Sequence, residues 1–161
     1  MRRAPALVTV AATAVVTLQN VSTDLTVPAV AMFERWIERA LNGLRSCGEL
    51  TIRVVDEEEG RSLNQQWRQR DYATNVMAFP IEGVESIAPD LLGDIVLCAP
   101  VIANEAVAQG KSATAHWAHL TVHGALHLLG FDHEDDATAR VMEARERRVL
   151  ATLDIADPYA L

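Results

Sequence analysis

Residues 123–133 have the sequence H-G-A-L-H-L-L-G-F-D-H. On an α-helix, residues four apart differ by about 40° around the axis, so His123 and His127 point the same way, one turn apart. Gly130 can take the left-handed conformation that ends a helix, and the chain can then turn back and bring His133 to the same point. Three imidazoles with one open position define a catalytic rather than a structural zinc site. The segment therefore predicts one Zn²⁺ per chain, bound by His123, His127 and His133.

Other polar side chains lie close to this segment. His119 and His116 fall one and two turns before His123, on roughly the same face. We interpret both as core or hydrogen-bonding residues around the ligands, because three nitrogens already complete an open zinc site. Asp132 stands beside His133, and the sequence leaves two alternatives for it: it orients a ligand imidazole, or it is a solvated loop carboxylate.

The helix that carries these histidines is apolar on nearly all sides, as expected for a helix buried between a sheet and a cleft. Helical spacing and end signals predict helices over 27–44, after Asp56 as N-cap, over 100–109, over 112–129 and after the acidic cluster 134–136. Alternating or β-branched residues predict strands over 50–55, 75–79 and 94–98. The expected fold class is α+β: a small mixed sheet of about four strands, with helices mainly on one face and a zincin-like central helix carrying the metal ligands.

The N-terminal segment has two interpretations. Arg2 and Arg3 precede an apolar run over 4–18, as in a secretory signal. The β-branched residues over 15–18 and Val21 favour instead a buried strand with a short leader. No stretch is long and apolar enough to predict a membrane span.

Composition narrows the class of protein. A chain of 161 residues that is 50% hydrophobic can bury one core without staples, so we expect a single domain over 1–161. The net charge of −8 argues against broad, charge-driven adhesion to nucleic acid but leaves room for a local basic site. Lys111 is the only lysine among 14 basic residues, so such a site would use arginine. Cys47 and Cys98 are too few to hold zinc by thiolates alone and suit a reducing compartment.

The histidine spacing is similar to that of metzincin peptidases. Those enzymes place a glutamate directly after the first histidine as general base, and here that position is Gly124. A glycine cannot accept a proton. The peptidase interpretation therefore loses its central chemical group, whereas zinc binding is unaffected.

The same segment, together with T-N-V-M-A-F-P at 74–80 and L-G-D-I-V at 92–96, closely resembles the YbeY family of bacterial metal-dependent endoribonucleases linked to ribosomal RNA maturation. The resemblance runs from about Thr51 to Tyr159. Glycine beside the first ligand separates this pattern from the peptidases. Phe131 stands where many relatives carry tyrosine, which removes a hydroxyl but no ligand. Residues 1–14 resemble an extension that typical members lack.

The family also has the pattern L-N-x-x-x-R-x-x-D-x-x-T, matched here by Leu63, Asn64, Arg68, Asp71 and Thr74. The resemblance assigns Arg68 a catalytic or substrate-binding role. Chemistry agrees, because a phosphoryl transition state is stabilised by a bidentate cation. We interpret Arg70 as a solvated side chain.

The resemblance implies a zinc-dependent endoribonuclease of the cytoplasm that acts on single-stranded RNA. Its role would lie in ribosomal RNA maturation, resembling 16S rRNA 3′-end processing, and in ribosome quality control. The expected partners are ribosomal RNA and ribosomal or ribosome-associated proteins, with no membrane. Two alternatives stay open: a metzincin-like zinc peptidase, and a non-catalytic ribosome assembly factor with a structural metal. The residues also leave open the native metal, the cleavage site, the oligomeric state and whether metal-bound water or the RNA 2′-hydroxyl attacks.

Overall fold

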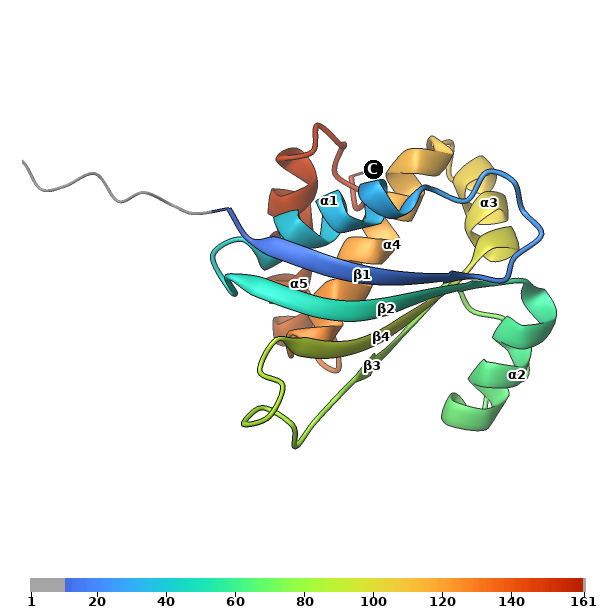
Figure 1. Ribbon diagram of the computed structural model, residues 1–161. Helices are drawn as coiled ribbons and strands as arrows, with labels where there is room; N and C mark the ends of the chain where they lie inside the picture. Colours follow the sequence, from blue (N-terminus) through green and yellow to red (C-terminus); the bar gives the residue numbers. More distant parts are fainter. Residues whose placement is uncertain (1–10, 161) are drawn as a thin grey trace, which may run out of the picture.

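The computed structural model describes residues 11–160, so residues 1–10 of the apolar leader lie outside the described residues. The elements in chain order are β1 (Thr13–Asn20), α1 (Val30–Leu41), β2 (Cys47–Val55), α2 (Glu57–Arg68), β3 (Val76–Pro80), β4 (Leu91–Cys98), α3 (Ala99–Ala108), α4 (Ala113–Leu128) and α5 (Asp136–Ala151) (Figure 1). Five helices and four strands over this range confirm the predicted α+β class. None of these helices is both long and apolar enough to cross a bilayer.

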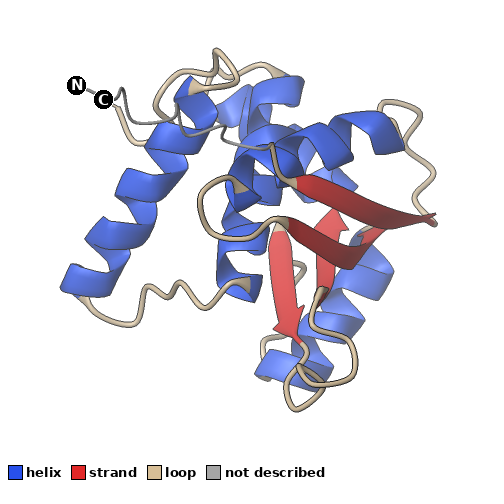
Figure 2. Ribbon diagram, turned by 60° about the vertical axis from the view of Figure 1, so that its left-hand side comes forward, coloured by secondary structure: helices blue, strands red, loops and turns tan. Residues whose placement is uncertain are grey.

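The four strands form one mixed sheet in the order β1-β2-β4-β3. β2 runs parallel to both of its neighbours, and β3 pairs antiparallel with β4. Parallel neighbours need a crossover, and α1 supplies the one between β1 and β2. Seen from the side in Figure 2, the strands twist relative to one another, as strands of L-residues do.

β1 confirms the strand interpretation of the N-terminal segment. It is an edge strand in which Ala14 and Val16 are buried while Val15 and Thr17 are exposed, so it is half-buried rather than fully buried. Thr13 and Ala14, which we placed in the extension, are already part of this strand and pair with residues 47 and 48 of β2.

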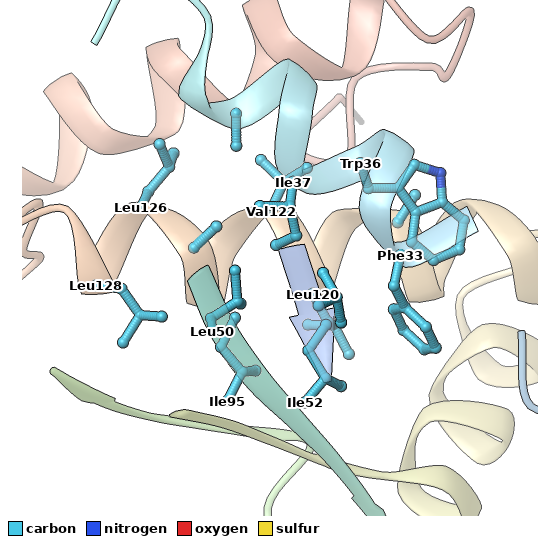
Figure 3. Close-up of a cluster of buried hydrophobic side chains, with 14 of the residues drawn as sticks. Phe33, Trp36, Ile37, Leu50, Ile52, Ile95, Leu120, Val122, Leu126 and Leu128 are labelled. Atoms are coloured by element: carbon cyan, nitrogen blue, oxygen red, sulfur yellow. The ribbon is translucent and has the colours of Figure 1, made fainter. Parts of the chain in front are cut away.

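The two faces of the sheet are covered unequally. α1 and α4 pack their apolar side chains onto one face, and α5 contacts both helices from outside. Figure 3 shows this main core, to which the helices contribute Phe33, Ile37, Leu120, Val122 and Leu126 and the sheet contributes Leu50, Ile52 and Ile95. Residues on the opposite face form a smaller cluster with Leu63 of α2: Val55, Met77, Val96 and Cys98. The expectation of helices mainly on one face is confirmed.

The helix ends follow the sequence signals in part, and α1 spans Val30–Leu41, three residues shorter at each end than the predicted 27–44. The Ser112 hydroxyl accepts a hydrogen bond from the backbone N–H of Ala115 at 3.1 Å and caps α4 as predicted. Asp135 opens α5 with a capping box. The prediction that Asp56 caps α2 is wrong for its side chain. Asp56 directly precedes the helix, but its carboxylate accepts hydrogen bonds from Ser22 and Thr23 rather than from the backbone N–H groups of α2. It therefore ties the segment after β1 to the start of α2.

Gly93 fixes the pairing of β4 with β3. Its φ of +141° is a conformation that side chains rarely adopt, and an added Cβ would collide with the carbonyl oxygen of Phe79. The two strands pair antiparallel across the intervening loop, which places Gly93 opposite Pro80. This pairing positions β3 beside α4.

Candidate metal centre

The three predicted ligands come together in the structure. His123 and His127 lie on one face of α4 with ring centroids 4.8 Å apart, and the His133 ring lies 4.8 Å from that of His127. One nitrogen from each ring can be chosen so that all three atoms lie within 4.8 Å of one another. This is the convergence that a single metal ion requires.

The turn after α4 brings the third histidine back. Gly130 has a φ of +97°, and its backbone N–H donates to the carbonyl of His127 at 3.0 Å. The N–H of Phe131 donates to the carbonyl of Leu126, also at 3.0 Å. These two bonds form the Schellman motif that a glycine after a helix favours. The predicted helix stop is thus confirmed, and it reverses the chain so that His133 reaches the site.

A buried carboxylate orients the first ligand. Oε1 of Glu146, a fully buried residue of α5, lies 2.7 Å from Nδ1 of His123. Its other oxygen, Oε2, lies 2.8 Å from Nε2 of His119 and accepts the hydroxyl hydrogen of Tyr159 at 2.6 Å. Burial raises the pKa of Glu146, but the hydrogen bonds from His119, His123 and Tyr159 outweigh it and bring that pKa down to about 2.

The ionised carboxylate decides which nitrogen of His123 carries the proton. A carboxylate can only accept hydrogen bonds, so Nδ1 of His123 is the donor and Nε2 keeps its lone pair for a metal. Metal-binding histidines commonly donate their second ring N–H to a carboxylate in this way. Burial and the nearby His123 and His133 lower the pKa of His127 to about 4, so this ring is neutral at pH 7. An imidazole nitrogen that keeps its lone pair for the site suits Zn²⁺ or a similar transition metal.

The histidines form part of a cleft of about 610 Å³. β3 and the segment before it supply one wall, with Thr74, Asn75, Val76, Met77, Ala78 and Phe79. The end of α2 adds Trp67 and Arg68, and the loop after α4 adds Asp132 and Glu134. The Arg68 side chain is exposed, and within residues 11–160 no carboxylate lies within ion-pair distance of it. The structure therefore brings the predicted arginine and the three predicted ligands into one cleft.

The remaining predicted residues take supporting or peripheral places. Asp132 accepts a hydrogen bond from the backbone N–H of His133 at 2.6 Å and none from an imidazole of the described residues, which favours the loop-carboxylate alternative. Asp71 forms a two-pronged ion pair with Arg61 at 2.7 and 3.0 Å. Arg70 is exposed and does not line the cleft.

His119 and His116 differ in their surroundings. His119 is the hydrogen-bonding neighbour that the sequence suggested, through Glu146. His116 is 2% exposed, and neither of its ring nitrogens has a hydrogen-bond partner among the described residues. Burial lowers its pKa, so it is a neutral core residue.

Sequence reasoning missed Glu146 and Tyr159. Glu146 falls in the buried stripe of α5 with Met142, Val149 and Leu150, at helical spacing. A carboxylate inside an apolar stripe needs a partner, and that signal could have pointed to a buried histidine. Tyr159 lies beyond the last helix, and no local pattern places it near α4.

Gly124 shows why no general base follows the first ligand. It is buried against β4, where an added Cβ would lie 3.0 Å from Cγ2 of Ile95. This position therefore offers neither a carboxylate nor free space for one. The helix approaches the sheet closely at the same residue.

Comparisons with known proteins identify relatives of this chain. The sequence profile described as Endoribonuclease YbeY matches residues 17–154. The chain is similar to Endoribonuclease YbeY of Stutzerimonas stutzeri (strain A1501), with 57% identity over 134 residues, 83% of this chain and 84% of the relative. It is similar to the Stenotrophomonas maltophilia (strain K279a) protein of the same name, with 56% identity over 137 residues, 83% of this chain and 85% of the relative.

A solved structure supports the fold. The solution structure of a Thermotoga maritima protein matches with a TM-score of 0.57 and 20% identity, over 90% of this chain and all of that one. The profile covers most of the chain and the bacterial relatives are more than half identical to it. The chain therefore belongs to the YbeY family of endoribonucleases.

Proposed function

We propose that the protein is a zinc-dependent endoribonuclease that cleaves single-stranded RNA in ribosomal RNA maturation. The observation that carries this proposal is the shared cleft, in which Arg68 and the histidines 123, 127 and 133 line the same space. A phosphodiester needs positive charge on its oxygens as it is cleaved, and this cleft concentrates the groups that supply it.

The three histidines, Arg68 and Glu146 have distinct tasks in the proposed reaction. The three histidines would hold the zinc, which would supply a Lewis acid for a phosphate oxygen and would lower the pKa of a bound water. The guanidinium of Arg68 binds two phosphate oxygens at once and holds the scissile group in place. Glu146 keeps His123 in the tautomer that binds metal. No carboxylate follows the first ligand, so proton removal does not depend on a base at residue 124.

An unpaired strand is the substrate that suits this cleft. A splayed strand can enter a cavity of about 610 Å³, whereas the deep groove of an A-form duplex excludes side chains. The net charge of −8 and the single free arginine of the cleft mean that few phosphates are neutralised. Binding should therefore depend only modestly on salt.

The proposed setting is the bacterial cytoplasm, with ribosomal RNA and ribosomal or ribosome-associated proteins as partners. The family membership supports an endoribonuclease. We extend the proposal to processing that resembles 16S rRNA 3′-end maturation and to a part in ribosome quality control. The two cysteines are free thiols, Cys47 partly exposed and Cys98 buried, which suits a reducing compartment.

The test compares labelled single-stranded RNA with the same strand in a duplex. Zinc-loaded protein should cut the single strand internally, leave the duplex largely intact and lose activity when a chelator removes the metal. A labelled peptide added in parallel should stay uncut. Intact RNA under all conditions, with unfolding on metal removal, would favour the non-catalytic assembly factor instead.

A further inference from the structure

Trp67 is the exposed tryptophan of this protein. Trp36 and Trp117 are 3% and 2% exposed in the main core, whereas 61% of Trp67 is exposed. Leu63, one turn earlier on α2, packs into the smaller cluster, but the helix carries Trp67 past the end of that cluster. Indole is costly to leave in water, so an exposed tryptophan at the rim of a cleft indicates a contact surface.

A second aromatic residue steadies this side chain. The rings of Trp67 and Phe79 meet in a T-shaped contact with centroids 5.9 Å apart. Phe79 comes from β3, so α2 and the sheet edge hold the indole together. A side chain fixed in advance loses little freedom when a ligand stacks on it.

Trp67 and Phe79 line two neighbouring spaces. One is the cleft with the three histidines, and the other is a hollow of about 560 Å³ on the exposed face of the sheet. We call it the second hollow, and its other lining residues are Gln19, Thr51, Arg53, Leu63, Pro80, Asp94 and Val96. The two aromatic residues are common to both linings, so a bound chain can pass from one space to the other across them.

The second hollow suits an uncharged planar group. Arg53 is paired with Glu59 through two hydrogen bonds of 2.6 and 2.7 Å, so its charge is compensated. Gln19 and Thr51 add an amide and a hydroxyl, which can both donate and accept hydrogen bonds. The free cation, Arg68, stands instead on the side of the metal centre. Asp94 also lines the second hollow, and its exposed carboxylate has no ion-pair partner among the described residues, so this hollow disfavours phosphate and leaves the phosphate side to Arg68.

We propose that Trp67 is a stacking platform for an unpaired nucleobase of the RNA substrate, and that the strand continues across it into the second hollow. This inference rests on the proposed function, since it assumes that RNA is the occupant. Single strands are commonly bound by bases stacked on aromatic side chains beside a cation that holds the backbone. The sequence Trp67-Arg68 provides both groups on adjacent residues at the end of α2.

Stacking on Trp67 gives a physical reason for a preference for unpaired RNA. A base in a duplex is already covered on both faces by its neighbours and cannot lie against the indole. Only a splayed nucleotide can place its base on Trp67 and its phosphate near Arg68. The platform therefore selects the strand by its lack of pairing and tolerates different bases.

Intrinsic fluorescence tests the contact directly, because the other two tryptophans are buried. A short oligouridylate titrated into the zinc-loaded protein should quench the emission of Trp67 in a saturable way. The same strand paired with its complement should not. In Trp67→Phe, which retains an aromatic ring, the quenching should disappear while the RNA still binds.

Kinetics provide the second readout. Trp67→Ala should raise KM for single-stranded RNA roughly tenfold, the range expected for one lost base stack, with kcat and zinc content close to those of the wild type. Trp67→Phe should restore most of the affinity. Tyr72→Ala is the matched control, because Tyr72 is 54% exposed on the loop after α2 but lines neither the cleft nor the second hollow. It should leave KM unchanged.

The outcomes separate this proposal from the proposed function. If the wild type cleaves single-stranded RNA but Trp67→Ala has an unchanged KM and oligouridylate causes no quenching, the stacking platform is wrong and the nuclease activity stands. If KM rises equally in Tyr72→Ala, the effect does not belong to Trp67. If the wild type neither cleaves nor binds RNA, the proposed function fails and the platform fails with it.

Discussion

The carboxylate of Glu146 lies 2.7 Å from Nδ1 of His123, and this contact joins the last helix to the metal centre. Glu146 also accepts hydrogen bonds from His119 and Tyr159, so one buried charge is shared among three donors. Its partners offset the cost of burying it, which would otherwise be several kcal/mol. The position of α5 is therefore coupled to the orientation of a metal ligand on α4.

The first prediction concerns this carboxylate. Glu146→Gln removes the negative charge that fixes the His123 tautomer, and loss of such a partner typically weakens metal binding about 10- to 100-fold. Competition against a chromogenic zinc chelator measures the change. Tyr159→Phe is the control, because it removes one donor to Glu146 and leaves both histidine contacts in place. A folded Glu146→Gln protein with wild-type zinc affinity would show that the contact does not support the metal.

The second prediction concerns the shape of the cation in the cleft. Arg68→Lys keeps the charge but loses the planar fork, so kcat for RNA cleavage should fall about 10- to 100-fold, as expected for one lost charge-assisted hydrogen bond. Zinc content and thermal stability should not change. Arg70→Lys, two residues later and outside the cleft, should retain wild-type activity. Equal rates in the two variants would mean that Arg68 does not contact the phosphate.

The third prediction is a pH dependence of the metal-free protein. Burial, together with the nearby His123 and His133, lowers the pKa of His127 from 6.5 to about 4. Between these values the unfolded chain binds a proton that the folded chain does not, so stability is lost as the pH falls through this range. The free energy of unfolding should drop by at most about 3 kcal/mol from this residue.

Urea unfolding at a series of pH values, with chelator present, measures this slope. His127→Ala should flatten it between pH 6.5 and 4. The low pKa of Glu146, about 2, adds a further loss only as the pH falls from 4.5 toward 2. Stability that rises on acidification from pH 6.5 would contradict the neutral, half-buried state of His127.

The fourth prediction concerns the strand pair beside the cleft. Gly93→Ala forces a side chain into a positive φ and against the carbonyl of Phe79, and should cost about 3 kcal/mol or more. Gly83 also has a positive φ, of +80°, but nothing lies within 4 Å of an added Cβ. Gly83→Ala should therefore cost only about 1 to 2 kcal/mol. Denaturation of the two variants side by side tests whether close approach, rather than φ alone, makes Gly93 necessary.

The convergence of the three histidines was predictable because the information is local. A four-residue spacing on a helix and a glycine that ends it suffice to bring His123, His127 and His133 together. Arg68 comes from a distant helix, and only the family resemblance connected it to the site. The sheet order could not be predicted from the strands alone, since pairing depends on contacts far apart in sequence.

The roles of residues that act through long-range contacts could not be predicted from the sequence. Glu146 falls in the buried stripe of α5, but its histidine partners lie on α4, so its role is visible only once α5 is placed against α4. Asp56 has the right residue type and position to cap α2, yet Ser22 and Thr23 lie close enough to take its carboxylate. Trp67 has the spacing of a core residue, but the smaller cluster ends before it. In each case tertiary neighbours override the local signal.

The most direct test of the metal centre measures cleavage of labelled single-stranded RNA as zinc is added back to metal-free protein. The rate in the wild type should rise in proportion to bound zinc and level off at about one zinc per chain, as three ligands with one open position require. His127→Ala, which loses one of those ligands, should bind little zinc and show almost no cleavage at the same added concentration. Full cleavage by metal-free wild type, or an unchanged rate in His127→Ala, would contradict the proposed metal-dependent reaction.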